Sequence, residues 1–212
     1  MIWALTGAAA AIYWALTLSE GHSIFRSAVK GLSVFPLAIA ALVAGMPAVA
    51  MALALCSLGD VVLSRPGDKA FLGGLIAFAL GHLAWIAVFF IRLSPDPAHL
   101  AAPLAFALLL GLAVLAGIMV RVLLPNAGDL RLPVAVYIGI IIAMGICGLM
   151  TAVPLVVLGA LAFAASDTLL GLQTFVLARG DRVERWANVL IWPLYWGAIV
   201  LLTLGTLGDG VF

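Results

Sequence analysis

Two aspartates interrupt long apolar stretches of this chain, and they stand in similar surroundings. Asp60 ends the phrase SLGD and is followed by VVL, whereas Asp167 ends the phrase AASD and is followed by TLL. A carboxylate among apolar residues is costly, and inside membrane segments such residues usually serve a function. Two carboxylates in unlike environments can divide into an acid and a base. The pair therefore points to acid–base chemistry.

Both aspartates are expected on helix faces made of small residues, because residues three or four apart share one face. The small residues at this spacing are Ala52 and Cys56 for Asp60, and Ala160, Ala164 and Gly171 for Asp167. Such faces let neighbouring helices pack closely and exclude lipid. An ionised carboxylate facing lipid would cost roughly 2.5 to 3.5 kcal/mol on insertion scales. We therefore expect both carboxylates to point into a helix bundle.

Six further polar side chains are candidates for the same site. They are Lys30, His82, Tyr137, Gln173, Asn188 and Tyr195. Counted along the expected helices at about 1.5 Å per residue, they lie with the aspartates in one half of the membrane or near its midplane. This predicts a polar pocket that opens toward the cytoplasm, with Lys30 at the start of the second helix. Lys30 could pair with Asp60, hold a phosphate, or only extend to the interface, and His82 could transfer protons or only pack.

The surroundings of the two aspartates suggest different protonation states. Asp60 has basic neighbours in Lys30, Arg65 and Lys69. A nearby cation favours the charged carboxylate, whereas burial without a cation favours the protonated acid. We therefore expect Asp60 to carry the negative charge and the deeper Asp167 to be the acid.

Several other kinds of site lack support. The net charge is +1 and no run of Lys or Arg could neutralise several phosphates, which argues against a nucleic-acid partner. Cys56 and Cys147 have no C-x-x-C partner and read as packing residues. Neither a known metal-binding spacing nor a nucleophilic serine motif is convincing. We expect no bound metal and no serine-based ester hydrolysis.

The elements that must position these residues are membrane-spanning helices. Of the 212 residues, 66% are hydrophobic and only 9% are charged, which is typical of a polytopic membrane protein. Apolar stretches predict an all-α fold in a single integral membrane domain over residues 1–212. The eight predicted spans are 2–18, 30–45, 47–63, 70–91, 100–121, 133–150, 153–178 and 186–207. The first reads as a retained helix rather than a signal peptide.

Basic residues predict the orientation of these helices, because short cytoplasmic loops are enriched in Lys and Arg. One side holds Arg26, Arg65, Lys69, Arg121, Arg131, Arg179, Arg182 and Arg185. The other side holds only Arg92. We therefore expect a protein of the cell membrane with both termini on the non-cytoplasmic side and its pocket in the cytoplasmic half.

The two aspartates each fall on the third helix of a set of four. Four helices return the chain to its starting side, so duplication would give two parallel four-helix halves, an arrangement known in transporters. The rest of the two halves matches poorly in sequence. Duplication and chance similarity both remain open at this point.

Taken together, the motifs resemble the YhhN family, which includes lysoplasmalogenases. The resemblance rests on KGL from Lys30, SLGD before Asp60, FLGGLIAFALGHLAW from Phe71 and YIGIIIAM from Tyr137, together with GALAFAASD before Asp167. It covers most of the chain. Gly31 and the YWGA sequence from Tyr195 depart from the family's usual pattern.

The resemblance implies hydrolysis of the vinyl ether of a lysophospholipid in the bilayer, without a cofactor. It implies that Asp167 donates the proton, that Asp60 stabilises the cation or activates water, and that His82 and Tyr195 position the groups. Lys30 would hold the phosphate, with Tyr137, Gln173 and Asn188 also contacting substrate. Two alternatives remain: a proton-coupled transporter using the same Asp, His and Lys residues, and a related hydrolase acting on another lipid.

Overall fold

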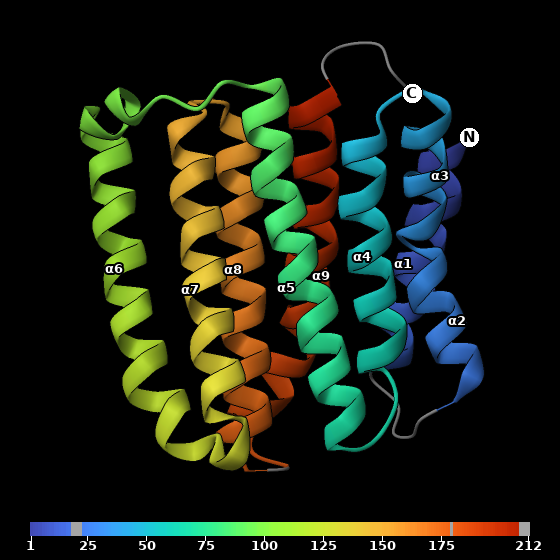
Figure 1. Cartoon of the computed structure of the whole chain (residues 1–212). Coiled ribbons are helices and arrows are strands. Elements are labelled where there is room, and N and C mark those ends of the chain that lie inside the picture. Colours follow the sequence, from blue (N-terminus) through green and yellow to red (C-terminus); the bar gives the residue numbers. More distant parts are fainter. Residues whose placement is uncertain (18–22, 179, 208–212) are drawn as a thin grey trace. The chain divides into compact units, whose positions relative to one another are not determined.

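A computed structural model describes residues 1–17, 23–178 and 180–207, and it contains only helices and turns there. The helices are α1 (Ile2–Thr17), α2 (Ile24–Leu32), α3 (Phe35–Val43), α4 (Pro47–Leu63), α5 (Asp68–Arg92), α6 (Pro103–Leu123), α7 (Arg131–Met150), α8 (Pro154–Phe175) and α9 (Arg182–Leu207) (Figure 1). Short 3₁₀ turns occur at Pro97–Ala101, Leu124–Asn126 and Gly128–Leu130. The all-α prediction is confirmed.

The helices make this a multi-pass membrane protein. Six segments of the described chain are long and apolar enough to cross a membrane, and α2 and α3 together count as one of them, Ile24–Val43. Two shorter apolar helices, α1 and α4, complete a set that corresponds to the eight predicted ranges. Within the described residues, the number and order of the apolar segments therefore agree with the sequence-based expectation.

The predicted boundaries were wrong at several ends. The second segment begins at Ile24 rather than at residue 30, because the Ser23 hydroxyl caps the helix by accepting from the Arg26 backbone N–H. It also breaks after Leu32, since Pro36 near the start of α3 has no N–H for the Leu32 carbonyl. Further along, α6 begins at Pro103, α8 ends at Phe175 and α9 begins at Arg182. Leu18 and Arg179 lie outside the described residues.

The chain forms two compact units. The first unit comprises the described residues of Met1–Val88, together with Leu207. Within it, α2 and α3 pack against α4, and α1 packs against α2 and α3. Glycines bring α5 close to α4: a Cβ on Gly74 would lie 3.1 Å from the Leu63 backbone nitrogen, and one on Gly81 would lie 2.9 Å from the Cys56 sulfur. Small residues thus allow the helix that carries His82 to pack tightly on the helix that carries Asp60.

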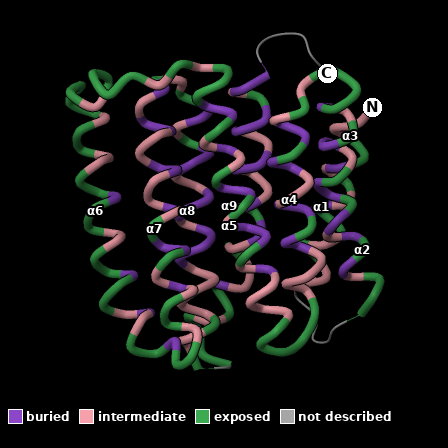
Figure 2. The backbone as a smooth tube through the Cα atoms, in the orientation of Figure 1, coloured by how far each residue is buried: buried purple, intermediate pink, exposed green. Residues whose placement is uncertain are grey.

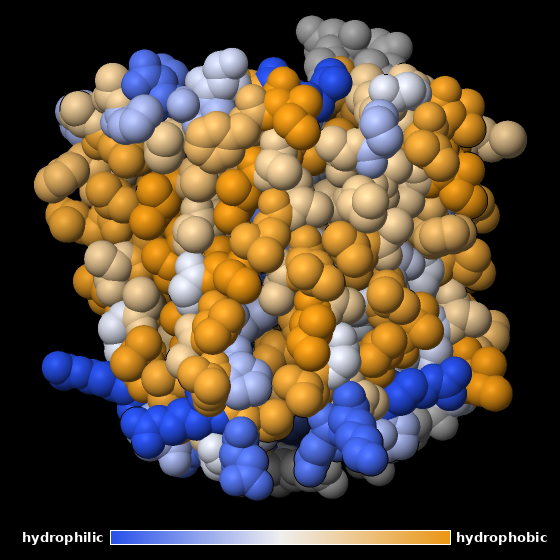
Figure 3. Space-filling model, viewed as in Figure 1, coloured by the Kyte–Doolittle hydropathy of each residue, from blue (hydrophilic) through white to orange (hydrophobic). Residues whose placement is uncertain are grey.

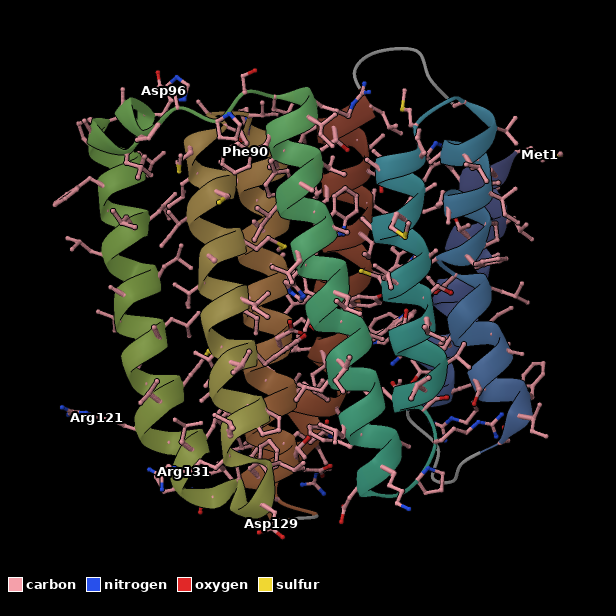
Figure 4. All side chains as sticks on the ribbon, in the orientation of Figure 1. Met1, Phe90, Asp96, Arg121, Asp129 and Arg131 are labelled. Atoms are coloured by element: carbon pink, nitrogen blue, oxygen red, sulfur yellow. The ribbon has the colours of Figure 1, made fainter. Side chains whose placement is uncertain are left out.

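The second unit comprises Phe89–Thr206. Within it, α7 packs against both α6 and α8. A Cβ on Gly159 would lie 3.0 Å from the Leu202 backbone nitrogen, so α8 and α9 also approach closely. In this unit Phe90 and Asp96 lie at one end of the helices, whereas Arg121, Asp129 and Arg131 lie at the other (Figure 4).

The surface of each unit has the composition expected for contact with lipid. Figure 2 shows buried positions recurring along α4, α7 and α8, whereas α6 is largely exposed. On the face drawn in Figure 3, apolar side chains cover the middle of the helices and hydrophilic side chains gather toward their ends. Exposed apolar residues on a membrane-spanning helix face hydrocarbon. The polar side chains buried inside each unit are therefore exceptions to the apolar composition of these helices.

Candidate functional site

Asp60 in the first unit forms an ion pair with Lys30. The Lys30 Nζ lies 3.1 Å from Oδ1 of Asp60, which is fully buried, and the lysine side chain is only 12% exposed. The prediction that Lys30 lies at the start of its helix was wrong, because α2 begins six residues earlier at Ile24, directly after the Ser23 cap. The lysine instead lies in the last turn of α2, where it contacts the carboxylate directly.

The pair is held by contacts among α1, α2 and α4. Gly31 allows α2 to approach α4, since a Cβ there would lie 2.9 Å from Cγ2 of Val61. The Ser57 hydroxyl, one turn before Asp60, donates to the Gly31 carbonyl at 3.2 Å. From α1, the Tyr13 ring lies 5.5 Å from the Lys30 Nζ, within the range of a cation–π contact. Sequence reasoning missed Tyr13, because nothing in an apolar helix indicates which aromatic residue will meet a cation.

Asp167 in the second unit has a different kind of partner. The Tyr137 hydroxyl of α7 donates to Oδ2 of Asp167 on α8 at 2.9 Å, and both residues are 7% exposed. Neighbouring side chains fix this part of α8. The Ser166 hydroxyl donates to the Ile191 carbonyl of α9 at 3.0 Å, and that of Thr168 donates to the Ala164 carbonyl at 2.7 Å. A neutral phenol therefore orients this carboxyl group, whereas a cation pairs with Asp60.

His82 is fully buried on α5 in the first unit. Its Nδ1 lies 2.7 Å from the Phe78 carbonyl oxygen, which can only accept, so Nδ1 carries a proton. In the neutral ring, Nε2 is then the nitrogen able to accept a hydrogen bond. The Phe78 side chain packs against Gly59, the residue before Asp60, which ties this turn of α5 to the aspartate helix.

The remaining predicted residues lie in the second unit. Tyr195 is 4% exposed, and its ring packs edge-on against Phe163 with centroids 5.3 Å apart and lies 5.5 Å from Trp192. Gln173 is half-buried and its amide donates to the Glu184 carboxylate at 3.3 Å. Asn188 is half-buried on α9. Ring packing thus fixes the position of Tyr195, whereas Gln173 is hydrogen-bonded to Glu184 near the connection between α8 and α9.

Two carboxyl groups with such different partners can perform different steps. The partner of Asp60 is an ammonium group, whereas the partner of Asp167 is a neutral phenol. Asp60 is therefore suited to stabilise positive charge, and Asp167 is suited to exchange a proton. Among the described residues, no group of three or more His, Cys, Asp or Glu side chains is arranged to hold a metal.

Comparison with known proteins adds a family relationship. The sequence profile of the YhhN family matches residues 25–206. Lysoplasmalogenases from Mycobacterium bovis and Mycobacterium tuberculosis are each 32% identical to this chain over 197 aligned residues, covering 87% of the chain and 71% of theirs. No solved structure matches it.

Proposed function

The chain belongs to the YhhN family, and we propose that it hydrolyses the vinyl ether bond of lysoplasmalogens. The products would be a fatty aldehyde and a glycerophospho-ethanolamine or glycerophosphocholine. The observation that carries this proposal is the similarity to two lysoplasmalogenases over 87% of the chain. The buried aspartates supply groups suited to the reaction.

The chemistry requires an acid, a stabilised cation and water, and no organic cofactor. A proton is added to the alkene carbon farther from oxygen, which produces an oxocarbenium ion at the adjacent carbon. Water adds to that carbon and loses a proton, giving a hemiacetal. The hemiacetal then collapses to an aldehyde and a free glycerol hydroxyl. The proton consumed in the first step is returned when water adds, so the overall reaction is hydrolysis.

We assign the steps to residues by their surroundings. Asp167, held by Tyr137, would donate the proton to the alkene, and the Asp60 carboxylate would stabilise the cation or activate water. Lys30 would hold the Asp60 carboxylate in place and could also contact the phosphate. His82 and Tyr195 would act as positioning groups, and Gln173 and Asn188 would contact the substrate.

The proposed orientation places the reaction in the cytoplasmic half of the cell membrane, with both described chain ends outside. Basic residues at helix ends support this assignment, since Arg121 and Arg131 flank the connection between α6 and α7 (Figure 4). This side would carry the polar headgroup of a substrate that enters from the inner leaflet.

Duplication is also proposed, and it is supported by equivalent positions in the two halves. Lys30 is the seventh residue of α2, and Tyr137 is the seventh residue of α7. Asp60 is the fourteenth residue of α4 and Asp167 the fourteenth of α8, and each of these helices begins with proline. In both halves, a polar side chain of one apolar segment thus contacts the aspartate of the following apolar segment.

The proposal is tested by incubating the purified protein with a lysoplasmenyl lipid and with its ester-linked analogue, followed by product analysis. Release of aldehyde from the first and no fatty acid from the second is expected. Fatty acid release would favour a different lipid hydrolase. If a panel of lipids stays intact while the protein moves a lipid or protons across vesicle membranes, a transporter would replace the enzyme.

A further inference from the structure

An apolar groove runs along α4 on the side covered by α2 and α3. One part has a volume of about 470 Å³ and is lined by residues that include Gly31, Ser57 and Val61. A second part of about 300 Å³ is lined by residues that include Leu42 and Pro47. Phe35 and Ala54 line both parts, so the two parts adjoin along α4. From Pro47 to Val61 it is about 21 Å long at the helical rise.

The groove exists because small residues of α4 face a broken helix. Ala50, Ala54 and Ser57 lie three or four residues apart and give α4 a shallow face. Opposite them, the break between α2 and α3 turns Phe35 outward, where it is 47% exposed. The rim residues Met51 and Leu58 are 60% and 52% exposed. On membrane-spanning segments this exposed side faces hydrocarbon, so the groove opens sideways into the bilayer.

The two ends of the groove differ in charge. At the end formed by Val61, the Ser64 hydroxyl donates to the Ser27 hydroxyl at 2.6 Å, which joins the start of α2 to the end of α4. Arg26 and Arg65 are the sequence neighbours of these two serines, and the Arg26 guanidinium donates to the Leu16 carbonyl of α1 at 2.7 Å. At the other end, Leu42 and Pro47 leave the groove apolar. An occupant that matches both ends has an anionic head at the arginines and a long apolar tail.

The charged end of the groove lies beside the turn of α4 that carries Asp60, although Lys30 and Asp60 do not themselves line it. Ser57 lines the groove and lies one turn before Asp60, and its hydroxyl bonds the carbonyl of Gly31, the residue after Lys30. In a vinyl ether lipid, the reactive bond lies at the head end of the chain. A chain laid along the groove with its phosphate at Arg26 and Arg65 would therefore bring that bond beside the turn carrying Asp60.

We propose that this groove binds the hydrocarbon chain of a single-chain phospholipid that enters from the bilayer, with its phosphate at Arg26 and Arg65. The inference rests on the proposed function for the identity of the reacting bond, but binding of the chain can be measured without turnover. The part of the groove beyond Ala54 would then determine which lengths of lipid chain fit.

The experiment uses a saturated ether lysophospholipid with a diazirine in the middle of its alkyl chain, which the proposed reaction cannot cleave. After illumination of the full-length protein in nanodiscs, mass spectrometry locates the labelled residues. We expect labelling of α3 and α4 residues that line the groove to be competed away by excess unlabelled lysophospholipid but not by hexadecanol. Labelling of outward-facing α6 residues should persist, because it reports ordinary lipid contact. Equal competition at both places, or none in the groove, would overturn the proposal.

Ala54→Phe tests the same groove by filling it, and Ala87→Phe is the matched control because Ala87 is an exposed alanine of α5 outside the groove. Ala54→Phe should lower competed labelling by about tenfold, the size expected when several methylenes lose their contacts. The control should retain it. An equal loss in both variants, each eluting as a single folded species, would contradict the assignment, and the wild-type labelling map decides the question if Ala54→Phe does not fold.

The outcomes also separate this inference from the proposed function. Competed labelling in the groove without aldehyde release would support the lipid groove and reject vinyl ether hydrolysis. Aldehyde release with no competed labelling of α3 and α4 would keep the reaction and reject the groove.

Discussion

The ion pair between Lys30 and Asp60 leads to a prediction about both the stability and the activity of the protein. Both groups are largely or fully buried, so removing one charge leaves the other in an apolar environment. Asp60→Leu should lower the free energy of unfolding by about 3–5 kcal/mol, whereas the double variant Lys30→Met/Asp60→Leu should regain most of it. Thermal unfolding in detergent measures both. Neither should release aldehyde, and a double variant no more stable than the single one would refute the importance of the pair.

The hydrogen bond from Tyr137 to Asp167 leads to a second prediction. Tyr137→Phe removes one hydroxyl and keeps the ring, so the carboxyl group loses its orienting donor. We expect kcat to fall about tenfold with little change in KM, because a hydrogen bond of this kind contributes about 1.4 kcal/mol. Thr203→Val is a suitable control, since the Thr203 hydroxyl bonds only the Ile199 carbonyl of its own helix. A similar fall in kcat for the control would show that any lost hydroxyl in this unit has the effect.

The sequence indicated several of these residues but only part of their contacts. Asp60 and Asp167 were identifiable because charged residues are rare in apolar segments, and Lys30 was correctly considered as a partner of Asp60. Tyr13 was not identifiable, because its contact with Lys30 depends on how α1 packs in three dimensions. The bond from Ser57 to the Gly31 carbonyl was missed for the same reason.

Close contacts between helices depend on particular glycines, and these lead to a third prediction. A Cβ on Gly74 would lie 2.9 Å from Cβ and 3.1 Å from the backbone nitrogen of Leu63, and backbone atoms cannot move aside cheaply. Gly74→Ala should therefore lower the unfolding temperature and the activity together. Gly111→Ala on α6 meets nothing within 4 Å and should leave stability equal or improve it by up to about 1 kcal/mol. A Gly74→Ala protein as stable as wild type would mean that α5 does not pack on α4 in this way.

Helix ends show where sequence patterns stop being informative. Hydropathy located every apolar segment, because the apolar composition itself sets which residues can cross a membrane. It misplaced the start of α2 because charged Arg26 follows the Ser23 cap and belongs to the helix. It also missed the break before α3, although Pro36 is visible in the sequence, since a proline near a helix start and one inside a helix look alike.

The orientation of the whole protein gives a fourth prediction. Single cysteines introduced by Ala101→Cys and Asp129→Cys lie in exposed turns at opposite ends of the helices of the second unit. A membrane-impermeant maleimide should label Ala101→Cys in intact cells, whereas Asp129→Cys should react only after lysis. The background from Cys56 and Cys147 can be removed by substituting both residues. The reverse labelling pattern would place the basic side of the protein outside the cell.

In the proposed reaction, a proton delivered by a buried aspartate starts cleavage of a vinyl ether. Its most direct test is the isotope content of the aldehyde formed in D₂O by the purified protein, trapped at once by reduction to the alcohol. We expect a single deuterium on the carbon next to the former carbonyl, and loss of this product in folded Asp167→Asn and Asp60→Asn proteins. Aldehyde without that deuterium, or unchanged turnover in either variant, would contradict it.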